Sequence, residues 1–100
     1  MVDWSTLEGF EWDAGNERKS ELKHAVSAGE AEQIFFNQPL LVVADGAHSH
    51  HETRWHALGT TDTDRLLHIT FTLRAHGRLI RVISARDMHR KERNLYAQSH

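Results

Sequence analysis

The 100-residue sequence contains no cysteine and only one proline, Pro39. Without cysteine the chain can form no disulfide framework, no thiolate zinc site and no cysteine nucleophile. It also lacks a basic N-terminus followed by an apolar run, and no stretch approaches the roughly 18 apolar residues of a membrane span. We therefore expect a protein of the reducing cytoplasm, with no signal for export and no membrane anchor.

Glycine-rich phosphate loops and spaced glycine fingerprints are absent as well, although the sequence has six glycines. Their absence excludes the usual motifs for nucleoside triphosphates and dinucleotides, and we expect no cofactor. No repeat, low-complexity tract or linker divides the chain, and its length suffices for one modest hydrophobic core. The sequence therefore predicts a single domain over residues 1–100.

Basic residues are scarce in the first half of the chain and abundant in the second. Residues 1–52 carry ten Asp and Glu against three Lys and Arg, whereas residues 53–100 carry four against nine, eight of them arginine. Guanidinium groups pair bidentately with phosphate oxygens and stack on bases, so an arginine-rich half is suited to binding RNA. The alternative is that these arginines pair with the acidic half of the same chain.

Helix signals occur near both ends of the chain. Asp13 is a suitable N-cap for a polar helix that runs to about His24, and a short extended piece at residues 10–12 precedes it. Ser27 and Glu30 have the spacing of a capping box, which predicts a second helix ended by residues 37–39. Asp87 is expected to cap a last, basic helix.

Four short β patterns separate these helices, at residues 40–44, 54–60, 65–74 and 78–85. The third alternates, with apolar residues on one face of the strand and polar residues on the other. Turn residues follow it at 75–77. We therefore predict an α+β fold with two N-terminal helices, a four-stranded antiparallel meander sheet and a C-terminal helix.

Polar side chains share one face of two neighbouring predicted strands. They are Arg54 and His56 on the first strand, and His68, Thr70, Thr72 and Arg74 on the second. Basic and hydroxyl side chains on adjoining strands would form a concave surface suited to a sugar–phosphate backbone. An ordinary solvated sheet face would show the same pattern, because threonine is favoured in strands in any case.

Two arginines interrupt the apolar pattern of the last strand. Arg81 lies between Ile80 and Val82, and Arg86 follows the run 82–85. A charge among apolar residues is costly unless it is paired or reaches solvent. Either these arginines form buried ion pairs, with partners such as Glu11, Glu52 or Glu92, or they line a groove that binds phosphate.

The segment His48-Ser49-His50-His51-Glu52 contains the side chains that bind transition metals. It is similar to the histidine–glutamate motif of the cupins, but only one residue separates His50 from Glu52, where that family leaves three or four. The predicted strands are also too few for two Greek keys. We therefore interpret the segment as a polar loop and expect no metal site.

Several segments together resemble the BrnT family of bacterial toxins over about residues 10–96. The matching segments are 10–13, 23–26 and IRVISARDMHRKER at 80–93, together with Tyr96 and with Asp45, His48, Glu52 and Arg54 between them. The first helix departs from the family pattern at Asn16, Ser20, Ala25 and Ala28. The resemblance implies a compact RelE-like ribonuclease fold and a type II toxin.

The resemblance also implies partners and site residues. The partners are an RNA substrate and a BrnA-like antitoxin, a DNA-binding protein that autoregulates the complex and holds the monomeric toxin within a hetero-oligomer. Metal-free cleavage through the 2′-hydroxyl requires a base, an acid and cations. For catalysis we predict Glu52, Arg54, Arg81 and Arg86, with Glu52 or a nearby histidine as the base. For RNA binding we predict Lys23, His24, His48, His56, Arg74 and Tyr96, with His56 or Tyr96 as proton donor or stacking surface.

A non-catalytic module that binds a protein or a nucleic acid through the same sheet face is the alternative function.

Overall fold

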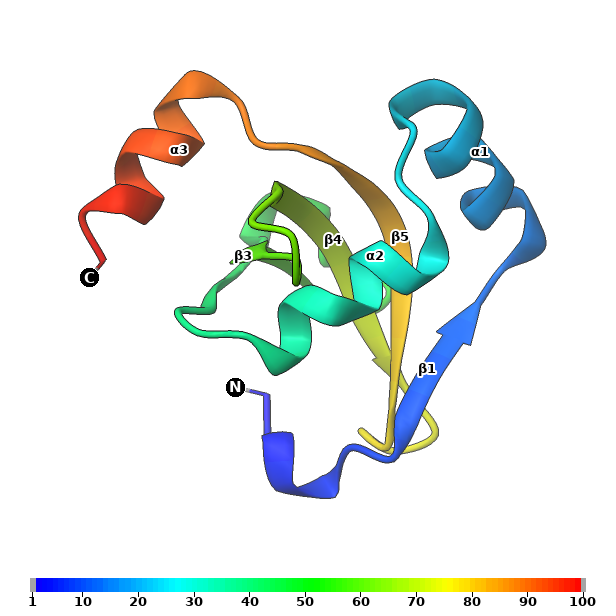
Figure 1. Cartoon of the computed structure of the whole chain (residues 1–100). Helices are drawn as coiled ribbons and strands as arrows, with labels where there is room; N and C mark the ends of the chain where they lie inside the picture. The colour runs from blue at the N-terminus through cyan, green and yellow to red at the C-terminus, as the bar shows by residue number, and fades with distance from the viewer. Residues whose placement is uncertain (1, 100) are drawn as a thin grey trace.

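A computed structural model describes residues 2–99 of the chain, which form three α-helices and a five-stranded sheet. The strands are β1 (Gly9–Trp12), β2 (Leu41–Ala44), β3 (Arg54–Thr60), β4 (Leu66–Arg74) and β5 (Leu79–Asp87). Their order across the sheet is β1-β5-β4-β3-β2 (Figure 1). The last four strands form the predicted antiparallel meander, whereas β1 pairs with β5 in parallel.

The helices are α1 (Ala14–His24), α2 (Ala28–Gln33) and α3 (Arg90–Ala97), with short 3₁₀ turns η1 (Trp4–Thr6), η2 (Ile34–Phe36) and η3 (Gly46–His48). The Asp13 side chain accepts hydrogen bonds from the backbone amides of Gly15 and Asn16 in the first turn of α1, and Ser27 and Glu30 form the capping box of α2, as predicted. The helix α1 lies beside β5, and α3 lies on the far side of the molecule, against β3 (Figure 1). No helix within residues 2–99 is long and apolar enough to cross a membrane.

Two details of the predicted fold are wrong. The sheet has five strands rather than four, because the extended piece at residues 10–12 pairs with Ile80–Val82 instead of standing alone. Asp87 does not cap the last helix, since it ends β5 and binds the Arg65 guanidinium through two hydrogen bonds of 2.7 and 3.0 Å. His89 is the N-cap of α3, and its backbone amide donates to Glu92 at 2.8 Å.

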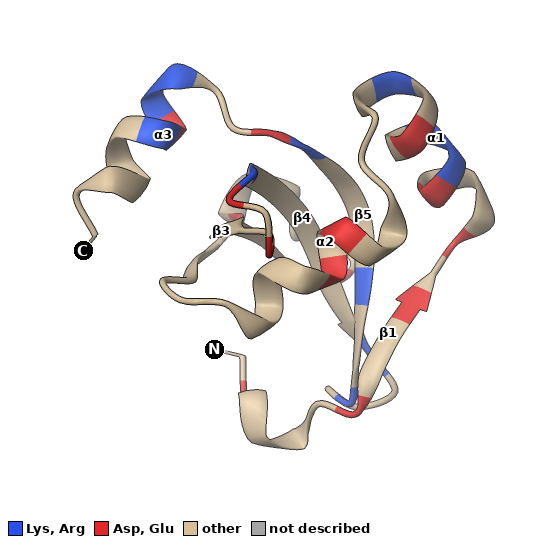
Figure 2. Ribbon diagram, viewed as in Figure 1, with Lys and Arg blue, Asp and Glu red and all other residues tan. Residues whose placement is uncertain are grey.

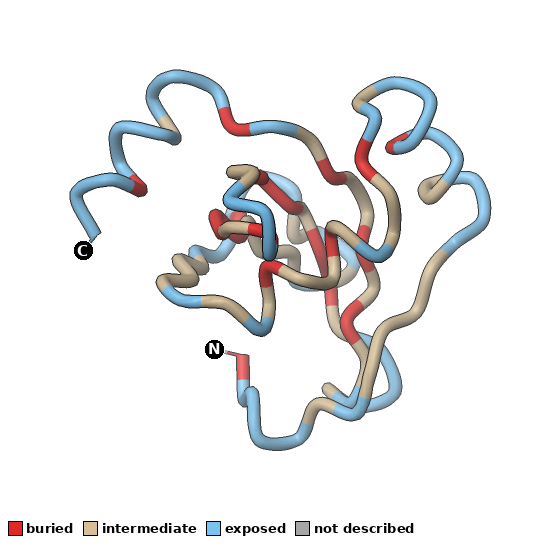
Figure 3. The backbone as a smooth tube through the Cα atoms, in the orientation of Figure 1, coloured by how far each residue is buried: buried red, intermediate tan, exposed pale blue. Residues whose placement is uncertain are grey.

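The main core lies between the sheet and α2 with η2. Its fully buried members include Ile34 of η2 and the alternating residues Leu67, Ile69 and Phe71 of β4. Figure 3 shows the buried segments gathered in the sheet, whereas α1 and α3 are largely exposed. At Gly59 an added Cβ would lie 2.8 Å from the Cβ of Ile34, and carbon atoms of two side chains do not approach each other so closely. The absence of a side chain at this position therefore lets η2 rest directly on β3.

A second, smaller core lies on the opposite face of the sheet. Successive residues of a strand point to opposite faces, and Ala57 belongs to the main core whereas Leu58 packs with Met88 and Tyr96. These contacts fasten α3 over one end of that face. Most of the remaining side chains on this face are polar, and we call this surface the polar face; it includes Arg54, His56, Thr70, Thr72, Arg74, Arg81 and Arg86.

Candidate functional site

The strand register assembles the polar face from β1, β3, β4 and β5. Arg54 lies opposite Thr72, His56 opposite Thr70, Arg86 opposite His68, and Arg81 between Thr72 and Glu11. The predicted grouping of basic and hydroxyl side chains on one face is therefore present. A bulge between Thr70 and Phe71 leaves Ile83 without an opposite residue, which keeps Arg81 and Arg86 on the same face although they are five positions apart.

Carboxylates share this face, so it is not the simple basic surface that we predicted. The Arg81 guanidinium lies 3.6 Å from Glu11 and 3.3 Å from Asp13, and that of Arg74 lies 4.0 Å from Glu11 and 3.8 Å from Glu52. Figure 2 shows the acidic strand β1 directly beside the basic β5. The arginine-rich half is thus partly neutralised by the acidic half, which was the alternative interpretation of the charge pattern.

Arg86 has the closest ion pair of the polar face. Its two terminal nitrogens donate to the two Glu92 oxygens at 2.8 and 2.9 Å, and the side chains of both residues are 23% exposed. The Arg86 hydrogen bonds, aided by the backbone amide of His89, lower the pKa of Glu92 to about 2 against the cost of burial. This pair ties α3 to the end of β5.

His68 is buried beneath α3 instead of facing solvent. Burial, together with the positive charge of Arg86, lowers the pKa of His68 to about 4, so the imidazole is neutral at neutral pH. Its Nδ1 atom has no hydrogen-bond partner within residues 2–99, and its ring lies 4.9 Å from that of His56. His68 therefore cannot supply a proton near neutral pH.

The buried His68 should make stability depend on pH. An unfolded histidine takes up a proton near pH 6.5, whereas folded His68 does so only near pH 4, so the free energy of unfolding should fall as the pH drops from about 6.5 to 4. The loss should reach about 2–3 kcal/mol. Urea unfolding of wild type and His68→Asn across this range measures it, with His76→Asn at the exposed hairpin as control. Equal slopes for wild type and His68→Asn would contradict a buried neutral imidazole.

Asp45 is the centre of a second cluster, at the junction of β2 and η3. Its Oδ2 atom lies 2.9 Å from Nδ1 of His48 and 2.9 Å from Nε2 of His56, and its Oδ1 atom accepts the backbone amide of His48 at 3.2 Å. The second ring nitrogen of His56 lies 3.1 Å from the Thr70 hydroxyl. The carboxylate is nearly covered, with 9% of the side chain exposed.

The backbone around β3 holds this cluster in place. The Asp45 amide donates to the Arg54 carbonyl at 2.8 Å, the Arg54 amide donates to Ser49 Oγ at 3.0 Å, and that hydroxyl bonds to the Asp45 carbonyl. These hydrogen bonds join Asp45, at the start of the loop that carries His48, to Arg54 at its end. This connection positions Asp45 beside His56, eleven residues further along the chain.

Arg54 differs from the other arginines of the polar face. Within residues 2–99 its guanidinium forms no ion pair, and its buried Nε atom has no hydrogen-bond partner. Arg54 lines a surface hollow of about 420 Å³ together with His48 and Glu52. Three of the predicted site residues thus line the same hollow. Arg54 supplies an unpaired cation, His48 an imidazole held by the Asp45 carboxylate, and Glu52 a second carboxylate.

Other predicted site residues lie elsewhere. Lys23 and His24 end α1, which packs along β5, two strands away from the hollow. Tyr96 is 4% exposed, its hydroxyl donates to the Pro39 carbonyl at 2.6 Å, and burial raises its pKa. The ring of Tyr96 is therefore packed between α3 and the sheet, and its face is not accessible for stacking with an RNA base.

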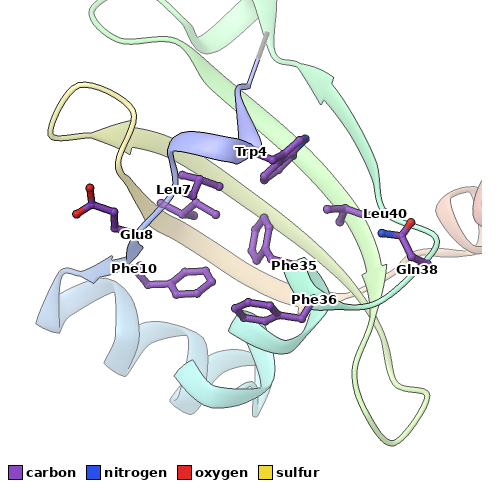
Figure 4. Close-up of a pocket in the computed structure, with 10 residues that line it drawn as sticks. Trp4, Leu7, Glu8, Phe10, Phe35, Phe36, Gln38 and Leu40 are labelled. Atoms are coloured by element: carbon purple, nitrogen blue, oxygen red, sulfur yellow. The ribbon is translucent and has the colours of Figure 1, made fainter.

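Two larger hollows are mainly apolar. One, of about 640 Å³, continues from His56 and His68 towards α3, between Val43 and Leu95. The other, of about 470 Å³, is lined by aromatic rings of η1, β1 and η2 with the exposed Phe36 at its rim (Figure 4). Glu8 is the one titratable side chain lining the second hollow within the described residues, so we place no acid–base chemistry there.

Asp45 is the central residue of the cluster but is not among the predicted site residues. It lies just past the predicted strand at residues 40–44, and the resemblance to BrnT toxins is the one signal that includes it. Its contact with His56 depends on the pairing of β2 with β3, which spacing does not show. Among the described residues, no group of three or more His, Cys, Asp or Glu side chains is arranged to hold a metal ion.

Comparison with known proteins agrees with this architecture. Residues 12–92 match the family model of BrnT, the ribonuclease toxin of type II toxin–antitoxin systems. The fold is similar to that of the Brucella abortus ribonuclease toxin BrnT, with 18% sequence identity and a TM-score of 0.63 over 82% of this chain and 97% of that chain. A search of curated protein sequences finds no match. Because the family model covers most of the sequence, the chain belongs to the BrnT family of ribonuclease toxins of type II toxin–antitoxin systems.

Proposed function

We propose that this BrnT-family chain is a cytoplasmic, metal-independent endoribonuclease that cuts RNA by a RelE-like mechanism, stops growth, and is neutralised by a BrnA-like antitoxin. The observation that supports it most directly is the hollow where Arg54, His48 and Glu52 meet. Cleavage by an RNA 2′-hydroxyl needs a proton acceptor and positive charge beside the phosphate, and these side chains supply both.

The reaction follows from the chemistry of RNA. The 2′-oxygen attacks the adjacent phosphorus, negative charge grows on the phosphoryl oxygens, and the 5′-oxygen departs. The Arg54 guanidinium is free to donate to those oxygens, whereas Arg81 and Arg86 already hold carboxylates. Glu52 or a histidine beside it takes the 2′-proton. The products are a 2′,3′-cyclic phosphate and a 5′-hydroxyl.

The antitoxin should act by covering the polar face. RNA must reach the hollow beside Arg54, so a bound protein that buries Arg54, Arg74 and Arg81 would exclude it. In this arrangement one toxin copy enters a hetero-oligomer through its substrate-binding surface. Neutralisation then needs no change of fold in the toxin.

Expression and cleavage assays test the proposal together. Expression in a bacterial host should halt growth, and co-expression of the neighbouring antitoxin gene should restore it. Purified protein should cut RNA equally in EDTA and in Mg²⁺, and should leave an RNA intact where the 2′-hydroxyl before the cleaved bond is replaced by hydrogen.

The outcomes separate the candidate functions. Cleavage that EDTA abolishes and one divalent ion restores would contradict metal independence. Growth arrest with intact RNA would favour the non-catalytic binding module, and normal growth with soluble, folded protein would count against toxicity itself.

A further inference from the structure

Asp45 holds two imidazoles with a single oxygen atom. Oδ2 lies 2.9 Å from Nδ1 of His48 and 2.9 Å from Nε2 of His56. Burial opposes the charge of Asp45, but the hydrogen bond from His48 and the charges of His48 and His56 outweigh it, so the pKa of Asp45 lies below its usual value. An ionised carboxylate only accepts hydrogen bonds, so each ring nitrogen facing Oδ2 carries a hydrogen.

This arrangement fixes the tautomer of His48. With hydrogen on Nδ1, the neutral ring presents the lone pair of Nε2 on its other side. The His48 side chain is 70% exposed, and Nε2 has no hydrogen bond within the described residues. An oriented lone pair that reaches solvent, backed by a buried carboxylate, is the geometry of a general base.

The other candidate proton acceptors near Arg54 are less available. Both ring nitrogens of His56 are occupied, one by Asp45 and the other by the Thr70 hydroxyl. Glu52 already has a cationic partner, because its Oε2 atom lies 3.8 Å from the Arg74 guanidinium. His50 and His51 lie exposed in the same loop and form no hydrogen bond or ion pair within residues 2–99, so nothing orients them.

From this geometry we infer that His48 is the residue that accepts the proton of the RNA 2′-hydroxyl, and that Asp45 is its positioning residue. The inference rests on the proposed ribonuclease function and assigns the base that the sequence left open between Glu52 and a histidine. A cap residue alone would need only Oδ1, which bonds the backbone of His48, and Oδ2 would be free to face solvent.

The inferred step moves one proton from the RNA to His48 and replaces one P–O bond by another. The O2′–H bond breaks and its proton moves to Nε2 of His48, while the O2′ electron pair forms the new bond to phosphorus. The P–O5′ bond breaks, and O5′ takes a proton from a water molecule. The resulting hydroxide removes the proton from Nε2, which restores neutral His48. Arg54, in the same hollow, faces the charge that develops on the phosphoryl oxygens.

Cleavage kinetics of four variants test the inference. His48→Ala should lower single-turnover cleavage on the order of 100- to 10,000-fold, the range for loss of a general base. Asp45→Asn keeps an oxygen for the η3 cap but loses the charge, and should lower kcat at least about tenfold with little change in KM. Combining the two should lower cleavage no further than His48→Ala alone, because Asp45 acts through His48. His76→Asn removes an exposed imidazole from the hairpin between β4 and β5, outside the hollow, and as the control it should cleave like wild type.

Nitrogen-15 NMR of the imidazoles gives a readout that a purely structural role would not move. In wild type His48 should be protonated at Nδ1 and unprotonated at Nε2, and Asp45→Asn should mix the two tautomers without loss of the folded spectrum. Cleavage by His48→Ala within threefold of wild type, or a His48 protonated at Nε2, would overturn the inference and leave the ribonuclease proposal intact. Wild-type protein that leaves RNA uncut would overturn both.

Discussion

Arg86→Ala is expected to lower the free energy of unfolding by about 2–4 kcal/mol, a large part of the stability of a small domain. The substitution removes both short hydrogen bonds to Glu92 and leaves that largely covered carboxylate unpaired, 3.9 Å from the neutral His68 ring. Glu92 also accepts the backbone amide of His89, the N-cap of α3, so the start of the helix should loosen with it. Urea denaturation of wild type and variant at pH 7 measures the loss, and Arg90→Ala, at an exposed arginine on the same helix, is the control.

The double variant Arg86→Ala/Glu92→Ala distinguishes the loss of the ion pair itself from the cost of leaving Glu92 unpaired. With both charges gone no carboxylate is left unpaired, so the double variant should be more stable than the sum of the two single losses predicts, by at least about 1 kcal/mol. Cleavage by Arg86→Ala should follow its folded fraction. A variant that melts like wild type yet cuts RNA about 100-fold more slowly would instead assign Arg86 to charge stabilisation.

The fold could be predicted wherever its signals are local in the sequence. The bounds of β3 match the predicted residues 54–60, and the caps of α1 and α2 follow from side chains within three residues of the helix start. The parallel pairing of β1 could not be predicted, because four residues give too few alternations and the partner strand lies about 70 residues away. Glu11 was among the partners that the sequence offered for Arg81, whereas Asp13, the second carboxylate beside Arg81, was not.

The candidate site could be predicted only in part, for the same reason. Alternation along β3 and β4 correctly placed Arg54, His56 and His68 on one face. Alternation does not show what covers a face, and α3 buries His68, which the pattern assigned to solvent or ligand. The family resemblance is confirmed by the match over residues 12–92, while the catalytic and RNA-binding roles of single residues stay predictions.

Charge pairing is what distinguishes the arginines of the polar face from one another. Arg74, Arg81 and Arg86 each face at least one carboxylate within 4.0 Å, and a phosphate would have to compete with it. Arg54 has no such competitor within the described residues, and its buried Nε atom is unsatisfied. A phosphate at the Arg54 guanidinium would displace no carboxylate, so Arg54 is the first candidate among these arginines for contact with RNA.

Arg54→Ala should therefore lower single-turnover RNA cleavage on the order of 100- to 1,000-fold, the loss expected when one donor to a developing negative charge is removed. The melting temperature should stay within a few degrees of wild type or rise, because the substitution breaks no ion pair and removes an unsatisfied buried donor. Arg54→Lys should recover part of the rate, since an ammonium supplies the charge but not the paired donors of guanidinium. Arg78→Ala, at the exposed hairpin outside the polar face, should cleave like wild type and controls for net charge. An Arg54→Ala protein that cuts RNA at the wild-type rate would remove this hollow from the cleavage site, whereas one that loses cleavage only through unfolding would give Arg54 a structural role.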